Sequence, residues 1–177
     1  MTARVVLASG SASRRAMFSA AGIEAVLDKP EVDESSLKHA LRIEGRTTEE
    51  AAMALARAKA EIVSARHPGA IVIGGDQMLD LEGDWLDKPA DLAGAADHLR
   101  RLSGRTHRLV SVVVAYRDDA PIWDATDIAT LTVRPLSPAF IDSYIAVTGE
   151  RILSSVGAYQ VEHLGIQLFE KIDGDHF

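Results

Sequence analysis

The residues best suited to chemistry follow a short apolar run at positions 71–73. The run ends in Gly74 and Gly75, and Asp76 and Gln77 come directly after them. An unbroken apolar run of this length predicts a strand buried on both faces, which ends at the glycines. A carboxylate out of water is costly, so the strand itself has no need of Asp76. Two interpretations remain open: Asp76 caps a backbone amide in an Asx-type turn, or it stands in a ligand crevice at the carboxyl end of the strand.

A second candidate is the segment that follows the first predicted strand, at residues 4–8. A loop of small residues, Ser9 to Ser13, leads into a helix predicted over residues 16–21, and Gly22 is expected to end that helix. A small-residue loop before a helix presents free backbone amides to an anion. The loop is not a P-loop, because no Gly-Lys-Ser/Thr follows it.

Arg14 and Arg15 stand at the first turn of this helix. Positive charge there opposes the helix dipole, which suggests a negatively charged ligand, and arginine suits bidentate phosphate contacts. The alternative is that Ser11 or Ser13 caps the helix while both arginines are solvated.

Two lysines are further candidates. Lys59 falls inside the apolar stripe of a helix predicted from Thr47 to about Arg66. The helix alone favours an ammonium that snorkels out to solvent; otherwise Lys59 points into an anion site. Lys88 follows a hairpin that we expect to turn at residues 82–84 and to return Lys88 toward Asp76. The alternative for Lys88 is an ordinary surface charge.

Glu34 lies in an acidic loop, residues 31–35, ahead of a helix predicted from Ser36 to about Ile43. Acidic residues before a helix are normally caps. Spacing alone therefore gives Glu34 no metal-binding role.

Composition limits what the protein can be. The 177 residues, 47% hydrophobic and 25% charged, suit one globular domain over residues 1–177. The net charge of −7 argues against a broad basic face for DNA or RNA, so we expect no nucleic-acid partner. Cysteine is absent, which excludes disulfides and Cys-rich zinc sites. The sequence shows neither a signal peptide nor a membrane-spanning run, so a cytoplasmic location is expected.

The rest of the chain predicts more helices and strands in alternation. Asp91 is expected to cap a helix to about Leu102, and a helix from Ser137-Pro138 runs to about Val147. Residues 107–116 and 122–133 predict an antiparallel hairpin, with one face wet. The alternation of strands and helices predicts an α/β fold.

The candidate residues and their surroundings together resemble the Maf nucleotide pyrophosphatases, also called septum formation inhibitor Maf proteins. Each matching fragment is short, but their order and spacing run through the whole chain. The fragments are residues 7–15 (LASGSASRR), Glu34, residues 55–60 (LARAKA), 73–77 (IGGDQ), 87–89 (DKP), 102–107 (LSGRTH), 157–160 (GAYQ) and 172–175 (IDGD).

The resemblance implies an elongated α/β protein similar to the inosine triphosphate pyrophosphatases, with a mixed sheet, helices and a cleft between two lobes. It implies a nucleotide diphosphatase, a hydrolase that converts a nucleoside triphosphate to the monophosphate and pyrophosphate with a divalent metal, Mg²⁺ or Mn²⁺. Its cellular role would be removal of non-standard or modified nucleotides, of the 7-methyl-GTP or the dTTP/UTP type. A homodimer is a further family expectation.

The resemblance also implies roles for individual residues. The position of Asp76 is that of the proposed proton acceptor, and Glu34 would help with metal or water, so Glu34 and Asp76 are the candidate metal ligands. Ser9, Ser11 and the cations Arg14, Arg15, Lys59 and Lys88 would hold the phosphates. Ser13, Gln77 and Gln160 match positions that vary with the base. Gln77 resembles the 7-methyl-GTP subgroup, whereas Gln160 suits a pyrimidine edge, so only a slight preference for 7-methyl-GTP follows.

Two departures from the family pattern bear on the site. Ser13 stands where the subgroup with a loop of this length has tryptophan. Maf chains also continue past Gly174-Asp175 to a Gly-Leu-Pro run, so we expect a family segment that could line the cleft to be missing here.

Two other functions remain open at this point. One is inosine or xanthosine triphosphate hydrolysis, which the Maf-like loop disfavours. The other is a nucleotide-binding regulator of septum formation that does not need turnover.

Overall fold

The computed structural model describes residues 4–174. Within that range, seven strands form a mixed sheet in the order β2-β1-β3-β5-β6-β7, with β4 paired to β3. Five α-helices accompany the sheet, which confirms the predicted α/β class. The chain divides into two compact units: the first contains residues 4–77 and 111–126, the second residues 78–110 and 127–174. The cleft between two lobes and the single domain stay predictions.

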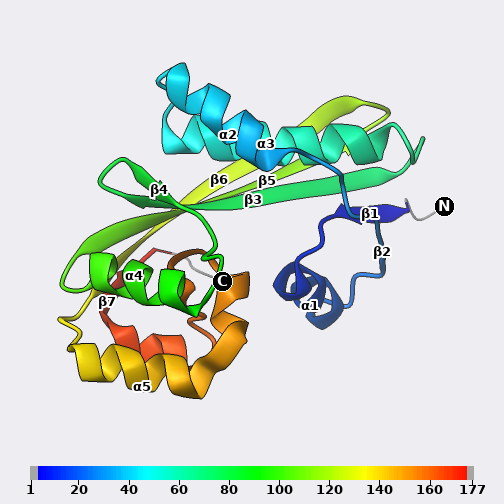
Figure 1. Ribbon diagram of the computed structural model, residues 1–177. Coiled ribbons are helices and arrows are strands. Elements are labelled where there is room, and N and C mark those ends of the chain that lie inside the picture. The colour runs from blue at the N-terminus through cyan, green and yellow to red at the C-terminus, as the bar shows by residue number, and fades with distance from the viewer. Residues whose placement is uncertain (1–3, 175–177) are drawn as a thin grey trace. The chain divides into compact units, whose positions relative to one another are not determined.

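The first unit contains the start of the sheet and three helices. Its elements are β1 (Val5–Ala8), α1 (Ala12–Ala20), β2 (Ala25–Leu27), α2 (Glu34–Ile43) and α3 (Thr48–Ser64), and the long strands β3 (Ile71–Leu81), β5 (Thr106–Arg117) and β6 (Ala120–Val133) contribute residues to both units. In the picture, α2 and α3 lie above the strands of this unit and α1 lies below them (Figure 1). This agrees with the apolar residues of β1 and of the first part of β3, Ile71 to Ile73.

The parallel strands of the first unit set the position of Asp76. β1 lies between β2 and β3, and its register with β3 runs from Val5 opposite Ile71 to Ala8 opposite Gly74. β1 ends there, whereas β3 continues. Residues of β3 after Gly74 therefore lie beyond the carboxyl end of their parallel neighbour.

The longest helix, α3, packs closely on β3. A capping box starts it, with the Thr47 side chain accepting from the Glu50 amide and the Glu50 side chain accepting from the Thr47 amide. A Cβ atom on Gly74 would lie only 2.6 Å from the Ala56 carbonyl oxygen and 2.9 Å from the Ala60 Cβ. The approach of helix and strand thus depends on the missing side chain at Gly74.

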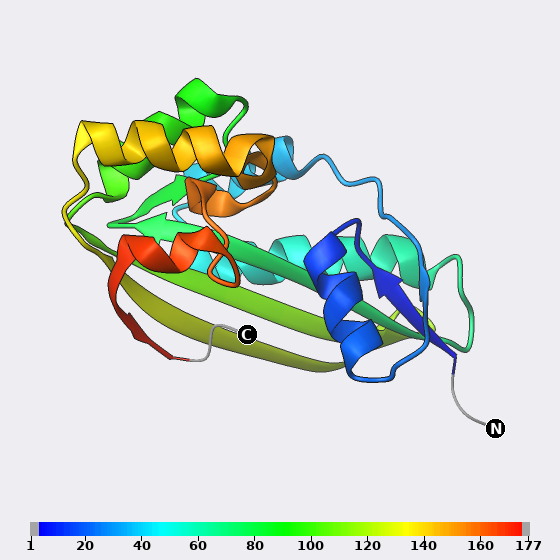
Figure 2. The same ribbon diagram turned by 90° about the horizontal axis from the view of Figure 1, so that it is seen from below.

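The second unit has its own hydrophobic core. Its further elements are β4 (Asp84–Leu86), α4 (Leu92–Leu102), α5 (Pro138–Thr148), the 3₁₀ helices η1 (Gly149–Ser154), η2 (Val156–Ala158) and η3 (Leu164–Leu168), and β7 (Phe169–Asp173). Helices α4 and α5 lie side by side in both views (Figures 1 and 2). Leu99, Leu131 and Ile152 are among the buried residues that fill the space between helices and strands.

Several predicted elements are confirmed, and three boundaries are wrong. Asp91 and Ser137 cap α4 and α5 as predicted, and Ser11 caps α1. Because Ser11 is the cap, α1 begins at Ala12 rather than at residue 16. Because Asp33 caps α2, that helix begins at Glu34 rather than at Ser36. The third error concerns β3, which does not end at the glycines but runs on to Leu81.

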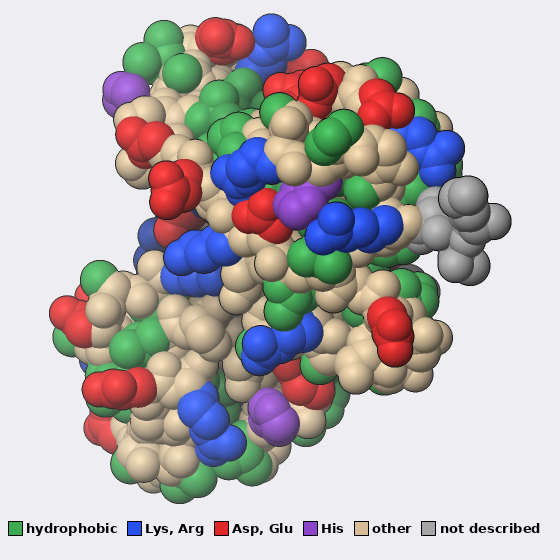
Figure 3. Space-filling model, turned by 90° about the vertical axis from the view of Figure 1, so that its right-hand side faces the viewer, with side chains coloured by type: hydrophobic (Ala, Val, Ile, Leu, Met, Phe, Trp, Pro, Cys, Tyr) green, Lys and Arg blue, Asp and Glu red, His purple; other side chains and the backbone are tan. Residues whose placement is uncertain are grey.

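The distribution of charge fits the acidic composition. On the face in Figure 3, Lys and Arg side chains are interspersed with Asp and Glu side chains instead of forming one continuous basic surface. Among the described residues, none of the helices has the length and apolar character needed to span a membrane. Asp175, the last residue of the matching fragments, lies outside the described residues.

We expect Gly74→Ala to destabilise the protein by about 1–3 kcal/mol, because the new methyl group would overlap the α3 backbone at Ala56. Gly10→Ala is the matched control: the nearest atoms to its Cβ would belong to the flexible Lys29 side chain, at 3.3 Å. Urea denaturation of both variants measures the difference. Equal stability of the two variants would contradict the close packing of α3 on β3.

Candidate active site

Asp76 lies within a strand and not in a turn. It is the sixth residue of β3, which continues to Leu81, so the Asx-turn interpretation is wrong. It stands two residues beyond Gly74, where pairing with β1 ends. Because side chains alternate along a strand, Asp76 points to the same face as Gly74, toward α3. Asp76 therefore lies beyond the carboxyl end of β1, its parallel neighbour, and not at the carboxyl end of its own strand, β3.

Lys59 contacts two carboxylates, those of Asp76 and Glu34. The Lys59 Nζ lies 2.6 Å from Asp76 Oδ1 and 2.9 Å from Glu34 Oε1. The side chains of Lys59 and Asp76 are only 9% and 8% exposed, whereas that of Glu34 is 44% exposed. The expectation that Lys59 snorkels to solvent is therefore wrong: its ammonium is held inside by two carboxylates.

The surroundings of Asp76 act on its proton affinity in opposite directions. Burial raises the pKa of Asp76 above the ordinary value, and the negative charge of Glu34 adds to this. The charge and hydrogen bond of Lys59, with a smaller effect from Arg14, oppose the rise in the pKa. The result is a carboxylate with a raised pKa beside a cation, the kind of group that can accept a proton from water.

Arg14 approaches β3 from the opposite face. Its Nη1 donates to the Gly75 carbonyl oxygen at 2.9 Å, and a Cβ atom on Gly75 would lie 3.6 Å from its Nε. Burial lowers the pKa of Arg14, and the charges of Asp76 and Glu34 oppose that effect. The guanidinium is thus fixed beside the peptide that precedes Asp76.

The loop between β1 and α1 is held by its own serines. The Ser11 amide donates to Ser9 Oγ at 3.1 Å, and the Arg14 amide donates to Ser11 Oγ at 3.4 Å. The amides of Ala12 and Ser13, in the first turn of α1, have no acceptor within the helix. Arg15 and Ser13 are exposed. These groups give the loop the donors and the positive charge that an anion requires.

Gln77 has a partner that the sequence did not suggest. Gln77 is exposed, and its Nε2 donates to Ser111 Oγ on β5 at 3.0 Å. Residues 75 and 77 share the face of β3 that Arg14 approaches. The Gln77 amide is therefore oriented on that face by Ser111.

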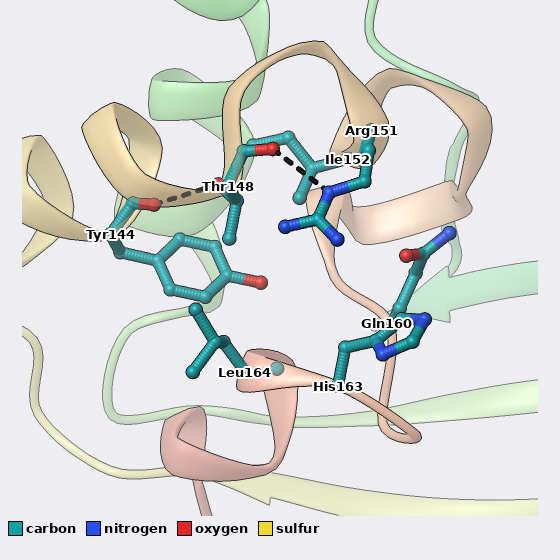
Figure 4. A pocket seen from close by; sticks show the side chains of 8 residues that line it. Tyr144, Thr148, Arg151, Ile152, Gln160, His163 and Leu164 are labelled. Atoms are coloured by element: carbon teal, nitrogen blue, oxygen red, sulfur yellow. Dashed lines mark hydrogen bonds between the residues drawn. The ribbon is translucent and has the colours of Figure 1, made fainter.

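Lys88 and Gln160 belong to the second unit. Lys88 is exposed, two residues after β4. Gln160 lines a small pocket, where it lies near Arg151 and His163 while Tyr144 and Leu164 lie across from them (Figure 4). The Gln160 Nε2 donates to Ser154 Oγ at 3.3 Å. The proposed roles of Lys88 and Gln160 in binding substrate stay predictions.

The structure brings together two of the oxygen ligands that a hard cation prefers, one on Glu34 and one on Asp76. Among residues 4–174, no three His, Cys, Asp or Glu side chains gather in a way that could hold a metal. A Mg²⁺ or Mn²⁺ ion fits this donor set if water and phosphate oxygens supply the other ligands.

Sequence reasoning missed two contacts of the site, Arg14 with the Gly75 carbonyl and Gln77 with Ser111. The first has a backbone acceptor, which any residue type supplies. The second joins side chains 34 residues apart on neighbouring strands. Ser111 could have been identified only by first predicting that β3 pairs with β5.

Comparison with known proteins places this site in context. Residues 4–177 match the model of the family described as Maf-like protein. A nucleoside triphosphate pyrophosphatase of Paramagnetospirillum magneticum is 50% identical over 97% of this chain and 89% of its own length. A 7-methyl-GTP pyrophosphatase of Mesorhizobium japonicum is 49% identical over 100% of this chain and 89% of its own length.

We expect Lys59→Met to destabilise the protein by about 3–5 kcal/mol, because the buried Asp76 carboxylate would lose the cation that compensates it. The double variant Lys59→Met/Asp76→Asn should lose less, because the one carboxylate left without its partner, Glu34, is 44% exposed and therefore solvated. Lys171→Met, which changes an exposed lysine, should have little effect. Denaturant unfolding near neutral pH compares the three, and a double variant less stable than Lys59→Met would count against the pair.

Proposed function

Because this chain belongs to the Maf-like protein family, we propose that it is a nucleoside triphosphate pyrophosphatase, an enzyme that hydrolyses its substrate to the nucleoside monophosphate and pyrophosphate. The names of its relatives support this activity. One observation of the structure carries the proposal: a buried carboxylate, Asp76, shares the Lys59 ammonium with Glu34, in the same unit as a loop whose free amides suit an anion.

In the proposed reaction, water attacks the α-phosphorus. A phosphorus–oxygen bond forms to the water oxygen, and the bond from the α-phosphorus to the bridging oxygen breaks, so pyrophosphate leaves. Asp76 Oδ2, which is not the atom that Lys59 contacts, accepts the proton of the attacking water. Phosphoryl transfer needs little covalent help, and positioning of the water with stabilisation of charge supplies most of the catalysis.

The cations of the first unit would bind the triphosphate. Arg15 and the amides of Ala12 and Ser13 would receive phosphate oxygens, which is supported by the start of α1 at the Ser9–Ser11 loop. Arg14 adds positive charge, although one of its donors is already used by Gly75. Lys59 would move its ammonium toward a phosphate. The phosphate-binding role of Lys88 stays a prediction of the family resemblance.

A divalent metal completes the proposed site. Glu34 and Asp76 would hold it, since their oxygens lie within 2.9 Å of the same Lys59 nitrogen and are hard ligands. When bound, the metal would neutralise phosphate charge that the protein cations leave uncompensated.

The base would be selected by Ser13, Gln77 and Gln160, and we favour 7-methyl-GTP over dTTP or UTP. Gln77 supports this choice, as does the name of the Mesorhizobium japonicum relative. The hydrogen bond to Ser111 leaves the Gln77 carbonyl oxygen available to accept from a base. The homodimer remains an expectation of the family resemblance, and the cytoplasmic location remains an expectation from the sequence.

A panel of nucleoside triphosphates with Mg²⁺ or Mn²⁺, assayed for pyrophosphate, tests the function. We expect the highest kcat/KM with 7-methyl-GTP, and Asp76→Asn should lower kcat by about 10²–10⁴-fold because the proton acceptor is lost. The control is Asp80→Asn, which changes another buried aspartate of β3 and should leave kcat close to that of the unchanged protein. Near-normal turnover by Asp76→Asn, or inorganic phosphate as the product, would exclude the mechanism.

The pH dependence of kcat/KM tests the electrostatics. Activity requires ionised Asp76, so it falls as the pH falls through the pKa of that group. Arg14→Gln removes a positive charge that lowers the pKa of Asp76, so the acid limb should move to higher pH. Glu34→Gln removes a negative charge that raises this pKa, so the limb should move to lower pH.

Profiles from about pH 5 to 9 compare the two variants. Both variants will also lose activity, but the sign of the shift does not depend on the size of that loss. Shifts in the same direction would show that Asp76 does not set the acid limb.

A further inference from the structure

We propose that Lys59 is a place-holding cation: it occupies the position of the divalent metal between Glu34 and Asp76 until the triphosphate draws its ammonium away. Metal and nucleotide then bind cooperatively, and the metal binds poorly alone. This inference rests on the proposed function, because it names how the same site admits its metal.

The contacts of Lys59 are those of a bound cation. One nitrogen atom lies 2.6 Å from Asp76 Oδ1 and 2.9 Å from Glu34 Oε1, and the Lys59 side chain is 9% exposed. An ammonium is a compact point charge with three donors, and two of them are directed to these carboxylates. The two oxygens offered to a metal are therefore already bridged by a positive charge.

Without nucleotide, a metal ion gains little free energy by binding between Glu34 and Asp76. Mg²⁺ must lie about 2.0–2.1 Å from its oxygen ligands, so it cannot share both oxygens with an ammonium without strong repulsion. Displacing Lys59 would leave its buried ammonium without a carboxylate partner, which is costly. Two carboxylates also supply too few ligands for either Mg²⁺ or Mn²⁺.

A triphosphate reverses this balance. Its oxygens give the Lys59 ammonium a new anionic partner and give the metal additional ligands. The flexible four-carbon stem of lysine allows the ammonium to move while the α3 backbone stays in place. Arg14 is less suited to such an exchange, because its planar guanidinium is anchored to the Gly75 carbonyl at 2.9 Å.

Direct Mn²⁺ binding, followed by calorimetry or by the electron paramagnetic resonance of free Mn²⁺, tests the inference without turnover. Without nucleotide, Lys59→Met should bind Mn²⁺ about tenfold or more tightly than the unchanged protein, which is a coupling of ordinary size. Lys59→Arg keeps the charge and should show no gain. Adding Glu34→Gln to Lys59→Met should remove the gain.

A non-hydrolysable α,β-methylene triphosphate completes the cycle. It should tighten Mn²⁺ binding strongly in the unchanged protein and much less in Lys59→Met. Equal Mn²⁺ affinities of the unchanged protein and Lys59→Met, both without nucleotide, overturn the inference.

A second measurement serves if Lys59→Met does not fold. In the unchanged protein, the ¹⁵N signal of the Lys59 ammonium, assigned by its loss in Lys59→Arg, should stay in place when Mg²⁺ alone is added and move when the analogue is added. Movement with Mg²⁺ alone, or none with the analogue, rejects the inference.

The two proposals fail separately. An enzyme that releases pyrophosphate but binds Mn²⁺ equally with and without Lys59 retains the function and loses the place-holding lysine. A protein that shows the Mn²⁺ gain but releases no pyrophosphate loses only the proposed function.

Discussion

The buried ion pair between Lys59 and Asp76 is the interaction on which the first unit depends. Each charge is nearly inaccessible to water, and removing either partner would leave the other without compensation at a cost of several kcal/mol. The pair forms only where α3 lies close against β3, so the packing that builds the core also assembles the site. A change that loosens this packing should therefore weaken stability and chemistry together.

The two glycines before Asp76 allow close packing around this point of β3. Gly74 faces α3, where even a methyl group would overlap the Ala56 carbonyl. A Cβ atom on Gly75 would lie 3.1 Å from the Val112 carbonyl oxygen of β5 and 3.6 Å from Arg14 Nε. Because the side chains of a strand alternate, Asp76 returns to the α3 face, one position after Gly75. In the sequence Gly-Gly-Asp, Gly74 thus allows the close approach of α3, and Asp76 then places a carboxylate on the same face of the strand.

Local signals predicted the elements well, and the environment of single side chains poorly. The cap of α3 and the periodicity of its apolar face are contained in a few neighbouring residues, so they were visible in the sequence. The contacts of Lys59 were not visible in the sequence, because periodicity shows which face of a helix a residue occupies but not which residues lie opposite it. The β-branched run before Asp76 indicated a strand, yet only the shorter length of β1 explains why a buried strand carries a carboxylate there. The contact between Arg14 and a backbone carbonyl leaves no trace in residue types.

The charge of the cluster explains why such a site would favour a polyphosphate with its metal over a simple anion. Arg14 and Lys59 are balanced by Asp76 and Glu34, so these four groups are close to neutral and by themselves add little attraction for a lone phosphate. An oxyanion that approaches Lys59 also meets two carboxylates, which repel it. A triphosphate with a divalent cation presents charge of both signs, with its oxygens for the lysine and its metal for the carboxylates. Discrimination would then come from the mixture of charges in the cluster, because a purely cationic pocket would accept any anion of suitable size.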